Sequence, residues 1–441
     1  MSDQGSGILW WDITDHPEFS PGELDQQWDV VIIGGGFSGL WSAHHLISSD
    51  PNLKIAVLEQ GQVGSGASGR NGGWASALYP ATDEKLLGHF PKGTVDNLHT
   101  HLRDAIDEIG TFIKEENIEC GFHKGGTLVV ARNLGQLKRL QSHVEHGSTI
   151  LDTQETHARI GITQALGAVY SPHCAALNPA ALVAGLAHSL EHRGVAIFEN
   201  TFAELSDTKK VQAQGREIKA DSVVRAIEAY HANSRDQIPI YSLMIATEPL
   251  PSEVFNEIGL HDHETFADGS HRVNYAQRTS DNRLAIGGRG APYTWGSRRN
   301  DAREIQQEIH QYLRKMAKEW FPILENYKFT HAWGGAVGIT RDWSPYLRWN
   351  GSYGEMGGYA GDGVTLSYLT AATMADLIMK RRSTRTQLPF VQWQNPQWER
   401  EPLRWIAVNS AIKLSSAADR EERMTHRPSL IMKALTPIIG K

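Results

Sequence analysis

The stretch WDVVIIGGGFSGLWSAHHLISSDPNLKIAVLE, residues 28–59, decides the fold class. It begins with an apolar run rich in β-branched residues at 30–33, which predicts a buried strand. Residues 34–39 fit the pattern G-x-G-x-x-G, and apolar residues then recur at helical spacing over 40–47. A second apolar run at 55–58 predicts another strand. Strand, glycine turn, helix and strand in this order predict a βαβ unit that binds a dinucleotide.

Each part of this unit has a physical role in holding a dinucleotide. Gly34 permits the tight turn out of the strand, Gly36 lets the backbone approach a pyrophosphate, and Gly39 lets helix and strand pack closely. The pyrophosphate then lies at the positive N-terminus of the helix. Glu59 ends the second strand, where a carboxylate can accept hydrogen bonds from ribose hydroxyls and disfavours the 2′-phosphate of NADP. The alternative is a tight βα turn in another α/β fold.

Length, charge and cysteine content limit the possible classes of protein. The 441 residues suffice for two domains or one large interleaved unit, and the net charge of −7 argues against nucleic acid as a main partner. The cysteines Cys120 and Cys174 form no C-x-x-C pair and the histidines show no H-E-x-x-H pattern, so we expect neither a disulfide framework nor a metal site. Residues 1–27 lack a signal-peptide pattern and no apolar run is long enough to span a membrane, so we expect a cytoplasmic location.

A second glycine-rich stretch, GSGASGRNGGW at 64–74, follows the strand that ends at Glu59. So many glycines suit a backbone that passes close to a ligand. Ser68 and Asn71 can donate hydrogen bonds to phosphate or ring oxygens, and Arg70 carries a fixed positive charge. The alternative is a flexible surface loop, but the stretch leaves the predicted sheet on its ligand side.

The rest of the chain alternates between helical and strand patterns. Periodicity predicts helices over 98–118, 134–146, 178–190, 302–321, 366–380 and 401–414. Apolar runs predict strands over 127–131, 195–198, 211–213, 217–220, 222–226, 240–246, 273–276 and 283–286. Residues 333–365 are rich in glycine and aromatic side chains, and we expect loops there.

These elements predict an α/β protein with two domains. A Rossmann-like nucleotide domain is assembled from separated segments, and a β-rich substrate domain is inserted between them. The expected division is an N-terminal arm over 1–27, a nucleotide domain over 28–80, 175–235 and 330–382, a substrate domain over 81–174 and 236–329, and a helical tail over 383–441.

Six segments carry a resemblance to a known family. They are GFSGLWSAHHL (36–46), GASGRNGGW (66–74), ATEPLP (246–251), YAQRTSDNRLAIGGR (275–289), WGGAVGITRDWSP (333–345) and GYAGDGV (358–364). The chain resembles the D-amino-acid-oxidase-like superfamily of FAD-dependent oxidoreductases, and within it the clade of γ-glutamylputrescine and aminophosphonate oxidoreductases. The resemblance extends from about residue 10 to about residue 425.

The resemblance implies a two-domain flavoprotein whose substrate domain has an antiparallel β-sheet. FAD would lie extended, its ADP half on the first glycine turn and its flavin half against the 66–74 loop and the turn at 359–365. The implied FAD contacts are Gly34, Gly36, Phe37, Ser38, Gly39, Glu59, Gln60, Gly66, Ala67, Ser68, Arg70, Asn71, Gly72, Gly73, Trp74, Phe202, Ala226, Gly361, Asp362, Gly363, Val364 and Thr365.

The chain departs from the family pattern at two positions near the expected cofactor. Glu228 follows the return strand in the sequence AIEAY, and its role there has no explanation from the pattern. Asp362 stands where many relatives have histidine, which puts a histidine-based role at that turn in doubt. Arg70 and Asn71 occupy the loop where some relatives attach flavin through histidine, and neither cysteine precedes the last nucleotide-domain helix. We therefore expect FAD to bind without a covalent bond.

The resemblance implies oxidation of a C–N bond in a primary or secondary amine, with hydride transfer to flavin N5 and hydrolysis of the resulting imine. A poorly hydrated aromatic pocket would favour the neutral amine. The expected substrate residues are Trp333 and Tyr359, followed by Trp74, Tyr275 and Arg278, with Tyr79, Trp343 and Arg289 as further candidates. Either arginine could bind a carboxylate or phosphonate. Core packing, or a surface salt bridge for the arginines, is the alternative for each.

The expected partners are a small-molecule amine and an electron acceptor, which is oxygen or another oxidant. A flavoenzyme of the same fold that oxidises a C–OH bond, and a flavin-binding subunit without catalysis, remain as alternatives. The sequence leaves open which amine is the substrate, the choice between oxidase and dehydrogenase, the oligomeric state and the role of the tail.

Overall fold

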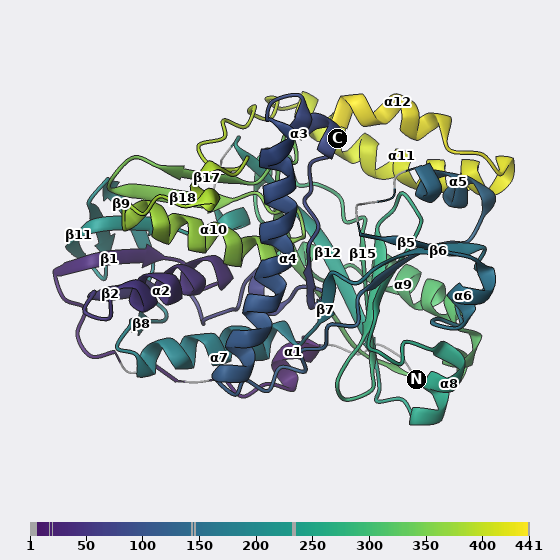
Figure 1. Cartoon of the computed structure of the whole chain (residues 1–441), viewed down its shortest axis with the longest axis horizontal. Coiled ribbons are helices and arrows are strands. Elements are labelled where there is room, and N and C mark those ends of the chain that lie inside the picture. Colours follow the sequence, from purple (N-terminus) through teal and green to yellow (C-terminus); the bar gives the residue numbers. More distant parts are fainter. Residues whose placement is uncertain are drawn as a thin grey trace.

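The computed structural model describes residues 7–16, 18–19, 21–142, 144, 147–231 and 235–439, and all structural statements below concern these residues. Parts of the expected arm and tail (1–6, 17, 20, 440 and 441), of the 134–146 helix (143, 145 and 146) and of the nucleotide segment before 235 (232–234) lie outside them. Two large sheets lie side by side, the first at the left of Figure 1 and the second at the right.

The first sheet has the parallel core of a nucleotide-binding domain. The strand β1 (Gln27–Ile33) pairs in parallel with both β2 (Ile55–Leu58) and β11 (Arg216–Arg225), so that Val30 lies opposite Ile55 and Ser222. The strand order is β17 (Tyr346–Trp349), β18 (Tyr353–Gly357), β11 (Arg216–Arg225), β1 (Gln27–Ile33), β2 (Ile55–Leu58) and β8 (Ala196–Phe198), with β10 (Lys210–Ala213) and β9 (Ala203–Asp207) attached to β11.

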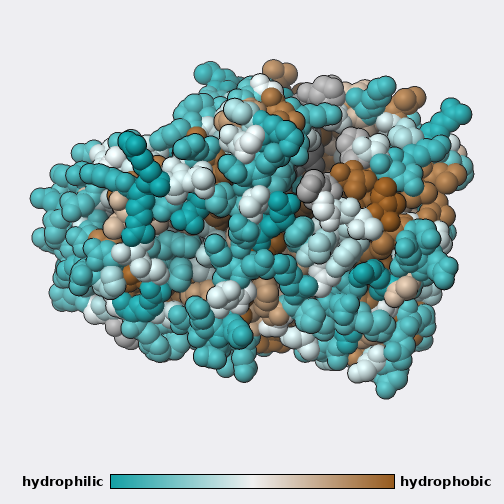
Figure 2. Space-filling view, viewed as in Figure 1, coloured by the Kyte–Doolittle hydropathy of each residue, from teal (hydrophilic) through white to brown (hydrophobic). Residues whose placement is uncertain are grey.

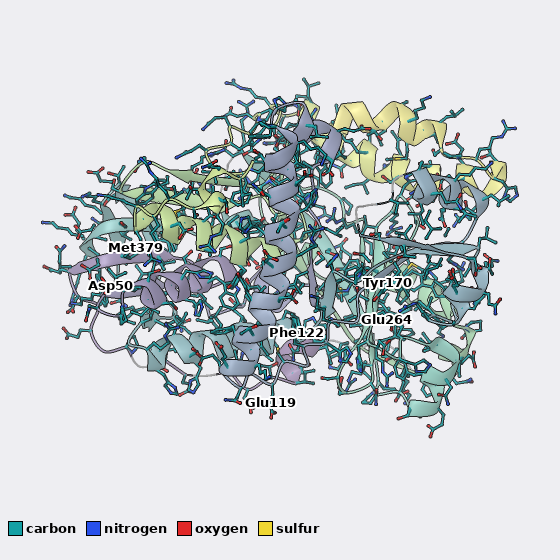
Figure 3. The ribbon with its side chains drawn as sticks, in the orientation of Figure 1. Asp50, Glu119, Phe122, Tyr170, Glu264 and Met379 are labelled. Carbon is teal, nitrogen blue, oxygen red and sulfur yellow. The ribbon has the colours of Figure 1, made fainter. Side chains whose placement is uncertain are left out.

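Both faces of β1 are buried, as expected for a continuous run of β-branched residues. Val30 and Ile32 pack into a core that contains α2 (Phe37–Ser49), α4 (Lys92–Glu115), α7 (Pro179–His192) and α10 (Gly363–Ile378). Val31 and Ile33 pack against the β9–β10 side. The helices α2 and α10 end next to each other, at the positions marked by Asp50 and Met379 in Figure 3. Because α2 connects the parallel strands β1 and β2, the predicted βαβ unit is confirmed.

The second sheet is mostly antiparallel, with one parallel pairing between β4 and β13. Its strand order is β16 (Phe329–Thr340), β12 (Gln237–Thr247), β15 (Leu284–Arg289), β14 (Asn274–Arg278), β13 (Thr265–Asp268), β4 (Thr127–Ala131), β6 (Gly167–Ser171) and β5 (Thr149–Leu151). A small separate sheet pairs β3 (Trp74–Ser76) with β7 (Cys174–Ala176).

The helices cover the outer sides of the two sheets, and α4 stands between them in Figure 1. They are α1 (Leu9–Asp12), α2 (Phe37–Ser49), α3 (Asp83–Leu87), α4 (Lys92–Glu115), α5 (Leu134–Ser142), α6 (Thr153–His157), α7 (Pro179–His192), α8 (Phe255–Ile258), α9 (Gln307–Trp320), α10 (Gly363–Ile378), α11 (Leu403–Thr425) and α12 (Leu430–Ile439). No helix of the described residues is long and apolar enough to cross a membrane.

Several elements differ from the expectations. The segment 333–365 is not loop, because it contains most of β16 and all of β17 and β18. The glycines that suggested a loop allow close approach instead: a Cβ on Gly334 would lie 2.7 Å from the Glu304 carbonyl oxygen, and one on Gly338 would lie 2.7 Å from a Glu228 oxygen. The two strands expected at 217–226 are one strand, β11, and α9 begins five residues later than 302.

Two expected domain boundaries also change. The strand β16 belongs to the second sheet, although 330–382 was assigned to the nucleotide domain. The helix α4, assigned to the substrate domain, packs in the same core as β1, α2 and α10. The expected arm contains α1, whose Trp10 is buried against Trp333. The rest of the domain division stays a prediction.

The face of the molecule in Figure 2 is mainly hydrophilic, with apolar side chains gathered at the right near α5 and β5. Leu134 and Ile150 are exposed apolar residues on these two elements.

Candidate functional site

Two cavities adjoin each other between the sheets. Cavity A has a volume of about 220 Å³ and begins at the glycine turn after β1, and cavity B has a volume of about 440 Å³ and lies against the second sheet. Four residues line both cavities, namely Ala67, Asn71, Val337 and Gly361. A molecule bound in cavity A therefore reaches the wall of cavity B.

The glycine turn of cavity A tolerates no larger residue at its two packing positions. Gly34 has φ +110°, and a Cβ there would lie 2.5 Å from the Ala226 carbonyl oxygen. A Cβ on Gly39 would lie 2.0 Å from the Gly34 carbonyl oxygen, where helix α2 crosses the turn. At Gly36 a Cβ would meet Ser68 Oγ at 2.8 Å, so this glycine keeps open the space between turn and loop. The spacing thus forms the cradle that a pyrophosphate requires.

Glu59 lies at the end of β2 and lines cavity A. Its Oε2 accepts a hydrogen bond from Gly35 N at 2.7 Å, and its Oε1 accepts one from Gly61 N at 2.8 Å. These bonds fix the carboxylate beside the turn, and each oxygen keeps a further lone pair for a ribose hydroxyl. This position fits the adenosine half of FAD.

Two helices point their N-termini at cavity A. Phe37 and Ser38 at the start of α2 line it, as do Gly363 and Val364 at the start of α10. Helix N-termini carry partial positive charge and free N–H groups, which stabilise phosphate and a negatively charged ring system. Cavity A therefore suits an extended anionic dinucleotide along its whole length.

The 64–74 loop is held in shape by its own side chains. Ser68 Oγ accepts a hydrogen bond from Phe37 N at 2.9 Å, and Asn71 Nδ2 donates to the Ser68 carbonyl oxygen at 2.7 Å. Trp10 Nε1 donates to the Asn71 carbonyl oxygen at 2.8 Å, so the N-terminal segment also braces the loop. Arg70 forms an ion pair with Glu304 on the second domain.

Most of the expected FAD contacts line cavity A: Gly34, Gly36, Phe37, Ser38, Glu59, Gln60, Gly66, Ala67, Ser68, Asn71, Phe202, Ala226, Gly361, Gly363 and Val364. Of the remaining expected contacts, Arg70, Gly72, Trp74 and Asp362 line cavity B, while Gly39, Gly73 and Thr365 line neither cavity. Gly39 acts through packing, and a Cβ on Gly73 would lie 2.2 Å from the Leu177 carbonyl oxygen.

Glu228, which the sequence left unexplained, lines cavity A directly after the return strand β11. Its φ is +42°, a left-handed conformation that is uncommon for glutamate. The buried carboxylate accepts hydrogen bonds from Gly338 N at 2.7 Å and from Ala229 N, and burial raises its pKa. Backbone N–H groups of Gly358 and Tyr359 also face it. Glu228 therefore ties β11, β16 and the turn before α10 together at the cofactor wall.

One face of the second sheet forms the wall of cavity B. Residues two apart on the same strands line it, because successive side chains on a strand point to opposite faces. These pairs are Thr127 and Val129, Val169 and Ser171, Ser242 and Met244, and Gly335 and Val337. The intervening residues pack on the other face with α9, in the core that contains Leu128, Leu243 and Leu313.

Trp74 and Tyr275 form an aromatic corner of cavity B. Their ring centroids are 5.5 Å apart at an interplanar angle of 74°. Gly287 makes room for this corner, since a Cβ there would lie 2.3 Å from the Tyr275 ring. The Tyr275 hydroxyl bonds Ser242 Oγ at 3.0 Å, and burial raises its pKa, so the phenol stays neutral.

Arg289 brings a buried positive charge into cavity B. Its Nη2 donates a hydrogen bond to the Ala360 carbonyl oxygen, in the turn that leads to α10. Burial lowers its pKa and the Asp362 carboxylate opposes this shift, but a guanidinium stays charged. No carboxylate among the described residues lies at ion-pair distance from Arg289. The site thus offers an unpaired guanidinium beside the wall that cavities A and B share.

Other expected substrate residues lie elsewhere. Trp333 is buried outside both cavities, where its Nε1 donates to the Arg70 carbonyl oxygen at 2.9 Å. Tyr359 lines cavity A, and its hydroxyl bonds Ser38 Oγ at 2.8 Å rather than facing cavity B. Arg278 lines neither cavity, because its guanidinium bonds Asn282 Oδ1 and stacks on Phe255 at 3.9 Å. Tyr79 is buried outside cavity B, and Trp343 lines it. Trp333 and Arg278 therefore do not line cavity B, and their expected substrate roles stay predictions that this placement does not support.

Sequence reasoning missed several cavity residues. Ile227 and Tyr230 line cavity A immediately after Ala226, and their position just beyond a parallel strand end was the signal that pointed to them. Val337 was missed because β16 was interpreted as a loop. Ser242, Met244 and His173 in cavity B had no sequence signal, since only the folded sheet brings them together.

Comparisons with known proteins agree with this geometry. The family model described as FAD dependent oxidoreductase (DAO) matches residues 29–377. A probable oxidoreductase OrdL of Rhizobium meliloti is 28% identical over 396 residues, covering 85% of this chain and 88% of its own length. The γ-glutamylputrescine oxidoreductase of Escherichia coli is 27% identical over 367 residues, covering 79% and 83%. The crystal structure of glycine oxidase from Geobacillus kaustophilus superposes with a TM-score of 0.71 at 20% identity, covering 84% and 99%.

Proposed function

The chain belongs to the DAO family of FAD-dependent oxidoreductases, and we propose that it oxidises the C–N bond of a small amine that carries a carboxylate or phosphonate. The observation that supports this substrate class is Arg289, an unpaired guanidinium buried in cavity B next to the shared wall. A planar guanidinium binds carboxylate or phosphonate oxygens through two parallel hydrogen bonds. Similarity to glycine oxidase and to γ-glutamylputrescine oxidoreductase supports the same class of reaction.

The walls of cavity B favour the reactive form of an amine. Val129, Val169 and Met244 contribute apolar surface, and Trp74 and Tyr275 add the aromatic corner. Removing an ammonium from water lowers its pKa, so an amine bound here loses its proton more readily. The neutral amine then has the nitrogen lone pair that C–H cleavage requires.

When bound in cavity A, FAD supplies the chemistry of accepting hydride from the carbon that bears nitrogen. The residues of the chain orient the two reactants. Arg289 holds the acidic group of the substrate, and the helix start at Gly363 places partial positive charge beside the shared wall. The imine product is hydrolysed by water, and oxygen or another acceptor takes the electrons afterwards.

The test compares two arginines of the same sheet. In the Arg289→Met holoprotein we expect binding of N-methylglycine or an aminophosphonate to weaken about 30- to 150-fold, the loss of a charge-assisted bidentate contact worth about 2–3 kcal/mol. Arg278→Met is the matched control and should behave as wild type. Anaerobic bleaching of the flavin spectrum measures both variants.

The same titration contains the outcomes that contradict the proposal. Dimethylamine, which lacks the carboxylate of N-methylglycine, should bind weakly to wild type and to Arg289→Met alike. Bleaching by hydroxy acids but by no amine would overturn the C–N assignment. Equal losses in the two arginine variants would overturn the role of Arg289. Readmitting air after bleaching then separates an oxidase from a dehydrogenase.

A further inference from the structure

A third cavity, cavity C, lies where the C-terminal helices meet the second domain. Its volume is about 330 Å³, comparable to those of cavities A and B. Its walls come from α9, from α11, from the chain after β4 and from the 268–272 loop between β13 and β14. It shares no residue with either of the other cavities.

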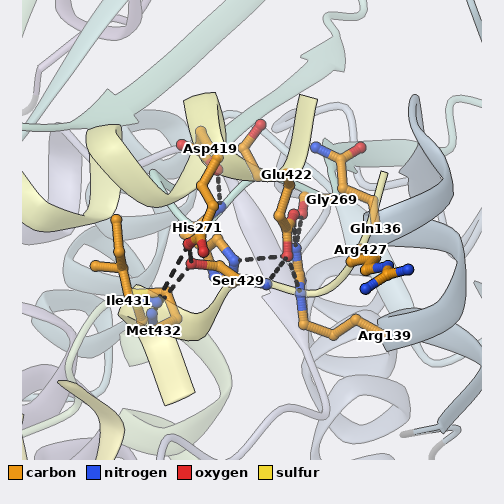
Figure 4. Close-up of polar contacts among 12 residues, drawn as sticks. Gln136, Arg139, Gly269, His271, Asp419, Glu422, Arg427, Ser429, Ile431 and Met432 are labelled. Carbon is orange, nitrogen blue, oxygen red and sulfur yellow. Dashed lines mark hydrogen bonds and ion pairs between the residues drawn. The ribbon is translucent and has the colours of Figure 1, made fainter. Parts of the chain in front are cut away.

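The α11–α12 helices are clamped onto this region by one buried carboxylate, shown in Figure 4. Glu422 accepts hydrogen bonds from Arg139 Nη2 at 3.0 Å and from Ser429 N at 3.2 Å, and it pairs with His271 Nε2 at 2.9 Å. Asp419, one turn earlier on α11, accepts from Arg272 N at 3.1 Å. These contacts attach α11 to the second domain, so α11 forms a fixed wall of cavity C.

The inner part of cavity C holds two charges of opposite sign that form no ion pair with each other, the half-buried Arg132 and the buried Asp268. Arg132 donates from Nε to the Thr163 carbonyl oxygen at 2.9 Å, and Asp268 accepts long hydrogen bonds from Ser270 N at 3.3 Å and Asn274 Nδ2 at 3.4 Å. Neither has an ion-pair partner among the described residues, although each influences the pKa of the other. Buried charges are normally paired, so this arrangement is incomplete by itself.

Cavity C also has a direct connection to cavity B. Arg272 lines cavity C, stacks on the Tyr312 ring at 3.8 Å and donates from Nε to the carbonyl oxygen of Arg289 at 2.9 Å. The guanidinium of that same Arg289 lines cavity B. A ligand that contacts Arg272 therefore touches a residue that is hydrogen-bonded to Arg289, whose guanidinium faces the proposed substrate in cavity B.

We infer that cavity C is a second ligand site, which binds a free polar α-amino acid and adjusts cavity B through Arg272. The zwitterion completes the charge arrangement, because its carboxylate pairs with Arg132 and its ammonium pairs with Asp268. The side-chain amides of Asn133, Gln136 and Gln164 line the same cavity and offer hydrogen bonds to an uncharged polar side chain. The site needs no redox step, so binding there is independent of turnover.

The binding test uses three matched probes on holoprotein that carries Arg289→Met, which removes the competing guanidinium of cavity B and keeps the carbonyl that Arg272 contacts. L-glutamine should bind with one site per chain by calorimetry. Glutaramate, which lacks the ammonium, and 4-aminobutanamide, which lacks the carboxylate, should each bind about tenfold or more weakly, the loss of one charge-assisted hydrogen bond. No detectable binding of L-glutamine, or equal binding of L-glutamine and glutaramate, overturns the inference.

Variants then locate the site. Asp268→Asn keeps an oxygen for Ser270 N but loses the charge, and it should weaken L-glutamine binding about tenfold while leaving glutaramate binding unchanged. Arg423→Ala at the exposed rim should weaken both, whereas Arg420→Ala, exposed on the same helix and outside the cavity, should weaken neither. In otherwise wild-type enzyme, L-glutamine should change the apparent KM for the amine, and Asp268→Asn should abolish that change. Undiminished binding in Asp268→Asn would place the ligand elsewhere.

Discussion

Cavities A and B adjoin each other, yet they are built in different ways. Cavity A is formed largely by backbone and small side chains at the ends of β1 and β2 and at the starts of α2 and α10. Cavity B is formed by side chains from seven strands of the second sheet, together with loops from the first domain. In cavity A a substitution acts by crowding the backbone, whereas in cavity B it acts by changing one functional group. The shape of cavity A thus depends on local backbone geometry, and that of cavity B depends on tertiary assembly.

The largest effect should follow from crowding the backbone of cavity A. Gly39→Ala places a Cβ against the Gly34 carbonyl oxygen at 2.0 Å. That oxygen belongs to the backbone, so the contact is relieved only if the turn or α2 shifts. We expect a loss of about 3 kcal/mol or more in folding stability and loss of bound FAD, because overpacking here displaces the phosphate-binding turn. The ratio of flavin to protein absorbance after purification measures the effect.

Gly93→Ala is the matched control for this change, since a Cβ at that helical position meets nothing within 4 Å. It should leave FAD content unchanged and stabilise the fold slightly, by about 0.5 kcal/mol. Normal FAD content in Gly39→Ala would contradict the difference between the two cavities, because it would show that the backbone turn of cavity A adjusts to an added methyl group.

A second experiment tests cavity B by weakening the contacts through which Glu422 on α11 holds the C-terminal helices against the second domain. Glu422→Gln removes the charge that Arg139 and His271 contact. The C-terminal helices also reach cavity B, because Nε1 of Trp343, which lines that cavity, donates to the carbonyl oxygen of Ile439 on α12 at 2.9 Å. We expect a loss of about 3 kcal/mol in stability, weaker substrate binding and unchanged FAD content. Thermal unfolding and flavin titration measure these together.

The pH dependence of this clamp has a definite sign. Burial by itself would raise the pKa of Glu422, but the hydrogen bonds and charges of His271 and Arg139 outweigh burial and lower this pKa from its ordinary value of 4.5 to about 2. A depressed carboxyl pKa means that the folded state gains stability above the ordinary pKa and loses it as the pH falls toward 2. The stability difference between wild type and Glu422→Gln should therefore be largest above pH 4.5 and shrink below it. A difference that stays constant down to pH 2 would contradict the clamp.

Among the residues that line the cavities or hold the tail, Tyr359→Phe should have the smallest effect. The hydroxyl bonds Ser38 Oγ and Thr370 Oγ1 inside the protein, so its loss should cost about 1 kcal/mol of stability and lower FAD affinity slightly. The rate of anaerobic flavin reduction by saturating amine should change less than threefold, which corresponds to less than about 0.7 kcal/mol in the activation free energy. A much larger drop in that rate would show that Tyr359 serves the substrate rather than the cofactor wall.

Sequence reasoning succeeded where function depends on neighbours in the chain. The glycine spacing, the terminal acid and the apolar runs at 28–59 specified the βαβ unit, because turn geometry and strand burial are set over a few residues. It failed for β16, where glycines that accommodate Glu304 and Glu228 looked like loop residues. It also could not separate Arg289 from Arg278, which lie on the adjacent strands β15 and β14 but face different surroundings.

The sequence by itself determined the family and its FAD cofactor through the resemblance of six segments, and it identified most of the expected contacts that line cavity A, since these rest on short-range patterns of backbone conformation. Only the tertiary structure decided which aromatic and basic residues line cavity B, where the tail docks and what Glu228 holds together. The physical reason is that strand register and domain contacts join residues that are far apart in the chain, and no local pattern records which of them will meet.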